Sequence, residues 1–249
     1  MKLYPAASIA SRRIPLTQLL AGYVIAAYDA AETADVIITG SGVSQHTDPI
    51  GARNLLQGTD NLRPIYTAAG SQSYYTGTAS APFRALKSDA GTSLSGGDLC
   101  FISVVKFNTL TTNRIWFSSG DGANVRTAFR THTSGTNFAA YVSDSVGFDL
   151  SMIGPTWDAN RHVHIMRNQV GVVRKYHVDG GAGYAGARTT AMATSQTLIG
   201  LLASDASSNA AHADAFYHAI CKPCPPAAVL NTFGAAAAVR FGLTWNDVS

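Results

Sequence analysis

Apolar and polar residues alternate with a period of two through the middle and late parts of the chain, and clusters of Gly, Asn, Asp and Ser interrupt the alternation. This pattern predicts antiparallel strands joined by short turns, because successive side chains of a strand point to opposite faces. The clearest strand is predicted over residues 99–107, which read LCFISVVKF. Further strands are predicted over residues 114–118, 125–132, 138–143, 161–166, 171–178, 195–200 and 215–220.

One later segment has a helical pattern instead. Residues 227–239 are rich in alanine, follow Pro225 and Pro226, and place Val229, Leu230 and Phe233 on one side. Proline is favoured in the first turn of a helix, so the helix is predicted to begin there. Strands and helices do not alternate along the chain, which argues against a parallel sheet. The sequence therefore predicts an all-β protein, an antiparallel two-sheet jelly-roll sandwich with one C-terminal helix.

The start of the chain has the outline of a signal peptide, with Arg12 and Arg13 before an apolar stretch over residues 14–27. The stretch is too short to span a bilayer and is interrupted by Pro15 and Gln18. We interpret it as structure: an N-terminal arm over residues 1–20, anchored through Arg12 and Arg13, before one jelly-roll domain over residues 21–249. No membrane association is expected.

The composition narrows the function classes. The 249 residues are 46% hydrophobic and carry a formal charge of +3 without a basic run, so neither a disordered chain nor a nucleic-acid binder is expected. Only 13% of residues are charged, against about a quarter in typical soluble domains. We therefore expect neighbouring subunits to cover part of the surface, as in a homo-oligomer.

Reactive groups are sparse in the sequence. Glycosidases need a pair of carboxylates, yet Glu32 is the single glutamate and no predicted strand carries two acids at i and i+2. No G-x-S-x-G motif presents a serine nucleophile. The pair Cys221 and Cys224 lacks the further ligands of a zinc site, and His162 with His164 is a pair only. The sequence thus predicts a non-enzymatic protein without a metal or other cofactor.

Two groups of residues are candidates for binding. Arg126, Arg130 and His132 lie on one side of a predicted strand, which is either a solvated sheet face or a groove for an acidic glycan or subunit. The second group consists of tyrosines in predicted loops, where an aromatic ring can stack on a sugar, fill a subunit interface or simply pack against the protein's own surface. These tyrosines are Tyr74, Tyr75 and Tyr184.

Eight short segments occur along the chain in the order expected of one known family. They are residues 23–30 (YVIAAYDA), 45–54, 62–66 (LRPIY), 95–98 (SGGD), 157–166, 176–180 (YHVDG), 198–200 and 240–243 (RFGL). Together they resemble the laminin-G-like and concanavalin A-like lectin and glucanase jelly rolls that occur in bacteriophage virion and bacterial surface proteins. The resemblance covers roughly residues 20 to 245.

The resemblance implies two main functions. The first is a structural component of a phage particle, as a head decoration, head spike or tail-associated protein that packs on other virion proteins. The second is a lectin-like module that recognises surface polysaccharide, located in the virion or at the cell exterior. A glycan hydrolase is a remote third reading.

Overall fold

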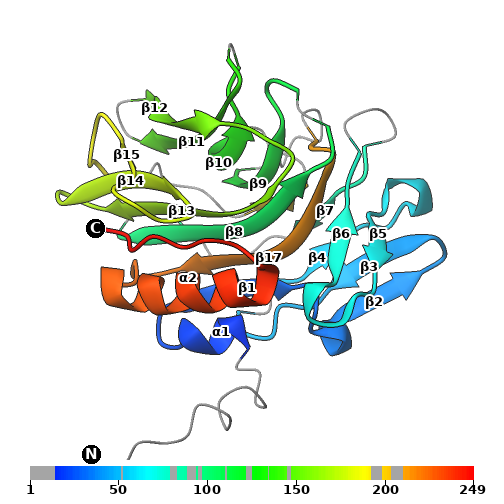
Figure 1. Cartoon of the computed structure of the whole chain (residues 1–249). Helices are drawn as coiled ribbons and strands as arrows, with labels where there is room; N and C mark the ends of the chain where they lie inside the picture. The colour runs from blue at the N-terminus through cyan, green and yellow to red at the C-terminus, as the bar shows by residue number, and fades with distance from the viewer. Residues whose placement is uncertain are drawn as a thin grey trace, which may run out of the picture.

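The computed structural model describes residues 15–51, 53–78, 83–88, 94, 97–109, 111–121, 125–133, 135–144, 147–191, 198–202 and 210–249. The named strands form two sheets, and every pairing between them is antiparallel. The two sheets stack as layers, with helix α2 (Ala227–Phe241) beneath them (Figure 1). The predicted all-β two-sheet sandwich with a C-terminal helix is confirmed.

The first sheet, sheet A, carries the helix. Its strands are, in spatial order, β15 (Tyr184–Ala185), β14 (Val173–Val178), β13 (Arg161–Gln169), β8 (Leu99–Phe107), β17 (Ala213–Cys221), β6 (Tyr74–Thr76) and β5 (Ile65–Thr67), with β1 (Val24–Asp29) also paired to β17. The 99–107 strand is confirmed residue for residue as β8. Its apolar residues alternate between two buried environments, which explains the nearly continuous hydrophobic run.

The second sheet, sheet B, contains the strands β12 (Gly147–Thr156), β11 (Asn137–Asp144), β10 (Val125–Thr131), β9 (Ile115–Gly120), β16 (Leu198–Leu201), β7 (Leu86–Ser88), β4 (Leu55–Leu56), β3 (Gly42–His46) and β2 (Val36–Thr39). The short helices are α1 (Leu16–Leu19), η2 (Thr33–Asp35), η3 (Asp60–Leu62) and η4 (Gly70–Gln72). No helix in the described ranges has the length and apolar character needed to cross a lipid bilayer.

The core between the sheets is strongly aromatic. Trp116 stacks on Phe129 with ring centroids 5.9 Å apart and meets Phe107 edge-on at 4.9 Å. Inward-facing residues of β8, β13 and β17 complete this layer, as expected for a sandwich in which each sheet buries one face. The aromatic rings therefore fix the sheet separation in this part of the sandwich.

The outer face of sheet A is buried by α2. Leu230, Phe233 and Phe241 pack on outward-facing residues of β8, β13 and β17. Pro226 precedes the helix, and Gly242 ends it in the left-handed conformation with φ +68°, which glycine adopts without strain. The chain then leaves the helix as an extended tail that lies across the same sheet.

The N-terminal arm is described only from residue 15. Leu16 and Leu20 are buried in the same apolar cluster as α2, so this part of the expected arm packs on the domain. The boundary at residue 20 stays a prediction. Arg12 and Arg13 lie outside the described residues.

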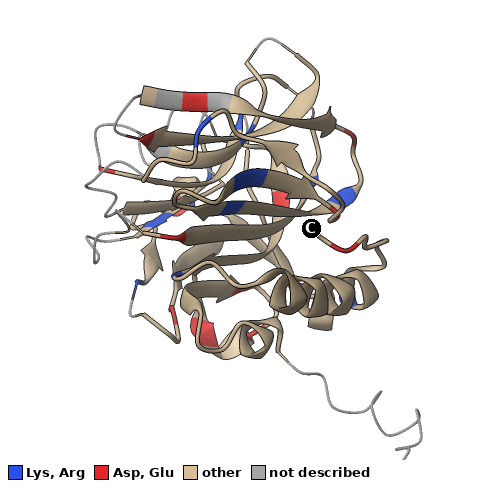
Figure 2. Cartoon of the chain, turned by 90° about the vertical axis from the view of Figure 1, so that its left-hand side faces the viewer, with Lys and Arg blue, Asp and Glu red and all other residues tan. Residues whose placement is uncertain are grey.

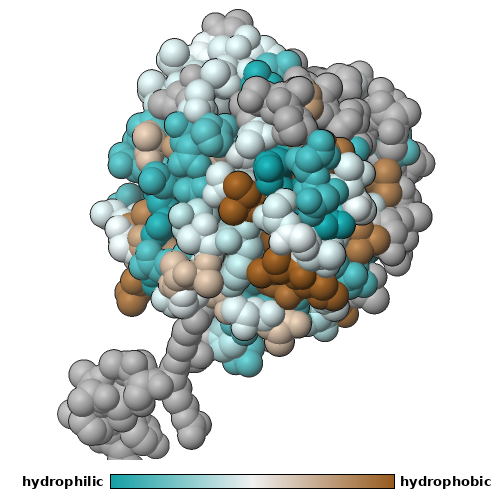
Figure 3. All heavy atoms as spheres, turned by 90° about the vertical axis from the view of Figure 1, so that its right-hand side faces the viewer, coloured by the Kyte–Doolittle hydropathy of each residue, from teal (hydrophilic) through white to brown (hydrophobic). Residues whose placement is uncertain are grey.

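Few positions along the ribbon are Lys, Arg, Asp or Glu, and basic and acidic residues are interspersed along the strands and loops (Figure 2). The side formed by β2 to β6 instead shows several hydrophobic patches among hydrophilic residues (Figure 3). On this side Ile37, Ile38 and Ile65 are about half exposed. β2 also forms the edge of sheet B, where the chain has neither a lysine nor a proline within the strand.

Candidate functional site

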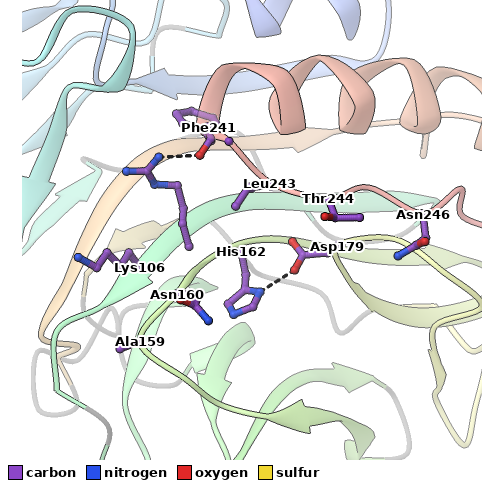
Figure 4. Close-up of a pocket in the computed structure, with 11 residues that line it drawn as sticks. Lys106, Ala159, Asn160, His162, Asp179, Phe241, Leu243, Thr244 and Asn246 are labelled. Atoms are coloured by element: carbon purple, nitrogen blue, oxygen red, sulfur yellow. Dashed lines mark hydrogen bonds and ion pairs between the residues drawn. The ribbon is translucent and has the colours of Figure 1, made fainter.

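A polar pocket opens where α2 ends and the C-terminal tail begins. Its volume is about 610 Å³, within the range of small-molecule sites. Four separate segments line it: the end of β8 at Lys106, residues 159–162 at the start of β13, Asp179 after β14, and the tail over residues 241–244 with Asn246 (Figure 4). The fold therefore gathers residues that lie up to 140 positions apart in the sequence.

His162 is held between two aspartates on one side of the pocket. Its Nδ1 lies 2.6 Å from Asp179 Oδ2, and its Nε2 lies 2.9 Å from Asp158 Oδ1. When both carboxylates are ionised, a ring that bonds them through both nitrogens donates from both, which favours its protonated form. Burial alone would lower the pKa of His162, but the hydrogen bonds to Asp179 and Asp158 outweigh it and raise the pKa.

The two aspartates are in turn fixed by the backbone. Asp179 accepts a hydrogen bond of 2.8 Å from the Val163 N–H, and Asp158 accepts one of 2.6 Å from the Asn160 N–H. Burial would raise the pKa of Asp158, but bonds from His162 and Asn160 lower it overall. His162 and Asp179 of this cluster line the pocket, and Asp158 holds His162 from behind.

Arg161 ties the end of the helix to the opposite wall. Its Nη1 donates to the carbonyl of Phe241 at 2.9 Å and to Gln72 Oε1 at 3.2 Å, and its guanidinium lies 4.1 Å above the Phe216 ring. These contacts fix the point at which the tail crosses β13. Arg161 therefore acts mainly as a support for the pocket.

Lys106 is the one lysine of the pocket wall. It lies directly opposite Arg161 in the pairing of β8 with β13. Among the described residues, no acceptor forms a hydrogen bond or ion pair with its ammonium group. A half-buried ammonium without a partner is free to bind an oxygen of a ligand.

The remaining lining supplies both polar and apolar contacts. Thr244 and Asn246 offer a hydroxyl and an amide, while Leu243 and Phe241 add apolar surface. Hydroxyl and amide groups both donate and accept, which suits a ligand covered with hydroxyl groups. In the described part of the chain, no group of three or more His, Cys, Asp and Glu side chains is placed to hold a metal ion.

The predicted tyrosine sites lie elsewhere, and the prediction that all three lie in loops is wrong. Tyr74 and Tyr75 are not in a loop but in β6. Tyr75 is only 1% exposed and bonds His46 Nδ1 through its hydroxyl at 2.6 Å, and Tyr74 packs on Phe216. Tyr75 therefore cannot contact a ligand. Tyr184 is exposed, in the short edge strand β15, and does not line the pocket.

The predicted basic face of β10 also lies away from this pocket. Arg130 bonds Asn113 and lies 5.4 Å from the centre of the Tyr141 ring. Together with His132 it lines a hollow of only about 30 Å³, room for a single water molecule. The Arg126 side chain lies outside the described residues. The hollow is too small for a glycan.

Sequence reasoning missed most of the pocket. The face shared by His162 and His164 was visible in the strand period, and both rings do contact Phe138 on the core side of sheet A. Lys106 and Thr244 had no local signal, because each acquires its role only from the packing of the tail on the sheet. A lysine at the end of an otherwise apolar strand was the nearest available clue.

The fold has clear relatives among solved structures. No protein-family model matches the chain, and no curated protein matches its sequence. Domain 4 of AbnA, a GH43 extracellular arabinanase from Geobacillus stearothermophilus in complex with arabinotriose, matches with a TM-score of 0.62 and 11% identity. That match covers 85% of this chain and 98% of the domain.

Two further structures share the fold. The Trypanosoma rangeli sialidase in complex with sialic acid matches with a TM-score of 0.57 and 11% identity, over 88% of this chain and 34% of the sialidase. The ligand-binding domain of Botulinum neurotoxin serotype D in complex with N-acetylneuraminic acid matches at 0.60 and 9%, over 89% and 54%. The chain thus spans about a third of the sialidase and half of the neurotoxin domain.

These proteins bind or act on carbohydrates. The chain shares their β-sandwich fold. At such low identity the likeness establishes the fold alone. It does correct one prediction from the sequence, that the protein is not an enzyme: the matched structures are parts of glycosidases, about a third of a sialidase and one domain of a GH43 arabinanase, so the scarcity of glutamate does not exclude a glycan-active protein.

Proposed function

We propose that this protein is a carbohydrate-binding domain that holds a saccharide in the pocket at the end of α2. One observation carries the proposal: a 610 Å³ pocket whose lining combines a lysine, asparagines, a threonine and apolar side chains. A sugar needs this mixture, because its ring has hydroxyl groups at the rim and C–H groups on its faces.

The walls of the pocket suit such a ligand. Asp179 is already oriented by bonds of 2.6 Å to His162 and 2.8 Å from the Val163 N–H, so its remaining carboxylate lone pairs can accept from sugar hydroxyls without rearrangement. Lys106 donates from the other side. Leu243, on the tail that faces His162 and Asp179 in Figure 4, supplies an apolar contact for the ring.

The fold supports the same proposal. The chain matches 98% of domain 4 of an arabinanase, which was solved in complex with arabinotriose. It also matches 34% of a sialidase. We infer that the chain supplies saccharide recognition outside the cell, alone or beside a catalytic unit. The expected place in a phage particle stays a prediction, because none of the three structures described above is a virion protein.

An oligosaccharide array that includes arabinotriose and N-acetylneuraminic acid tests the proposal. Each binding glycan is then titrated by calorimetry against Lys106→Met and Thr244→Val. Loss of a charge-assisted hydrogen bond at Lys106 is expected to weaken binding about tenfold or more, and loss of a neutral one at Thr244 about fivefold.

Two matched substitutions serve as controls. Lys87→Met removes a half-buried lysine of sheet B, and Thr59→Val removes an exposed threonine before η3. Both are expected to bind as the wild type does. The proposal is wrong if no glycan binds, or if the pocket variants keep wild-type affinity for every glycan that does bind.

A further inference from the structure

A row of polar side chains crosses the otherwise apolar core between the two sheets. Ser103 of β8 lies directly opposite His164 of β13 on one side and directly opposite His218 of β17 on the other. The three residues are 0%, 0% and 1% exposed. The His164 ring lies 4.9 Å from the Trp116 ring, and the His218 ring lies 4.9 Å from the Phe117 ring, so both histidines face β9 of sheet B.

Five polar atoms in this row have no hydrogen-bond partner within the described part of the chain. They are Ser103 Oγ, His164 Nε2, both ring nitrogens of His218 and the indole nitrogen of Trp116 beside His164. His164 uses only its Nδ1, which lies 2.6 Å from the Tyr176 hydroxyl. Buried polar groups in folded proteins almost always have a hydrogen-bond partner, because burial takes them away from water. Five unpartnered atoms on neighbouring side chains therefore point to a bound ligand.

The chemistry of these atoms selects a small neutral ligand that both donates and accepts hydrogen bonds. The Trp116 indole only donates, the Ser103 hydroxyl does both, and a neutral imidazole has one donor and one acceptor. Burial lowers the pKa of His164, and it lowers the pKa of His218 to about 3, so neither ring offers a charge to an anion. The row also lacks the third His, Cys, Asp or Glu of a metal site among the described residues.

We propose that the row is an internal water-binding site, in which at least one water molecule bridges Ser103, His164 and His218. A water molecule supplies two donors and two acceptors, and buried waters typically bond about three protein groups. Ser103 is smaller than Phe101 and Val105, its neighbours on the same face of β8, which favours this position for the water. The bridge joins β13, β8 and β17 through their inward side chains. None of the three bridged residues lines the pocket at the end of α2, so the inference is independent of saccharide binding.

A high-resolution crystal structure of the wild-type protein tests the proposal directly. Density for a water molecule is expected about 2.7–3.2 Å from at least two of three groups: Ser103 Oγ, His164 Nε2 and a ring nitrogen of His218. A core without such density, or rings that bond one another or Ser103 directly, would overturn the proposal.

Magnetic relaxation dispersion of water counts long-lived internal water molecules in solution and assigns them through variants. Ser103→Val replaces the hydroxyl with methyl groups that fill the same space, so it is expected to lose at least one long-lived water. The control is Ser88→Val, at a buried serine of β7 whose hydroxyl already accepts from the Ile199 N–H at 2.8 Å, and it is expected to lose none. An unchanged count in folded Ser103→Val contradicts the proposal, and the wild-type crystal structure decides if that variant does not fold.

Discussion

Two clusters of charged residues in this protein have the same ingredients but opposite surroundings. At one edge of the sandwich, Arg174 of β14 bridges to Asp144 of β11 and Asp149 of β12, at 2.9 and 3.0 Å. At the end of α2, His162 bridges Asp158 and Asp179 at similar distances. The Arg174 cluster is wholly buried, while Asp158 is 47% exposed and faces open space.

The difference in burial indicates a structural role for the Arg174 cluster and a binding role for the His162 cluster. In the Arg174 cluster the guanidinium also bonds Asn168 and the Thr190 carbonyl, so its donors are used within the fold. Buried charges without such partners would be strongly destabilising. The pocket instead keeps an unpaired ammonium, that of Lys106, beside partly exposed carboxylates. The first cluster joins the sheets, and the second is available to a ligand.

The largest expected effect is on stability at the buried cluster. Arg174→Met leaves Asp144 and Asp149 without their main cation and is expected to lower the free energy of unfolding by about 3–5 kcal/mol. Urea denaturation measures it, with Arg188→Met as the control, because that side chain is 29% exposed and is expected to matter less. Arg188 also bridges Asp144, so losses below about 1 kcal/mol in both variants would show that the cluster is not structural.

A second contrast concerns histidines. Burial lowers the pKa of His46 to about 4 and of His218 to about 3, whereas the pKa of His162 in the pocket is raised. Between pH 6.5 and 4 both buried histidines bind a proton in the unfolded chain but stay neutral in the folded protein. The free energy of unfolding is therefore expected to fall as the pH falls. For His46 alone the expected loss in the free energy of unfolding is roughly 3 kcal/mol.

His162 works in the opposite direction. Its folded pKa is raised, so its stabilising contribution is present below pH 6.5 and is lost as the pH rises through that folded value. NMR titration of the imidazole signals checks both statements. They fail if His162 titrates below pH 6.5, or if His46 and His218 titrate near 6.5 in the folded protein.

The smallest expected effect is at Tyr184. Its ring is 39% exposed and lies outside the pocket, so Tyr184→Ala is expected to change neither saccharide affinity nor the free energy of unfolding by more than about 0.5 kcal/mol. Calorimetry and urea denaturation measure the two quantities. A loss of affinity comparable to that of Lys106→Met would move the binding surface to the β15 edge.

The sequence predicts this fold better than its site. Period-two alternation locates β8 and the strands around it, because local side-chain geometry decides that pattern. β12 was missed, since Gly154 and Pro155 interrupt its pattern while pairing with β11 still forms the strand. Tyr75 was assigned to a loop because of its Gly and Ser neighbours, yet a bond to His46 and pairing with β17 bury it. Lys106 and Thr244 come to line one pocket only through tertiary packing, which no local pattern records.

Chemical-shift mapping by NMR tests the proposed saccharide site most directly. Backbone amide signals are followed as the best glycan from the array is added to saturation. The largest shifts are expected at Lys106, at residues 159–162, at Asp179 and at residues 241–246, with the amides around Arg174 unchanged. Saturable shifts confined to β10, β11 or β15, with the pocket amides unmoved, would contradict the account.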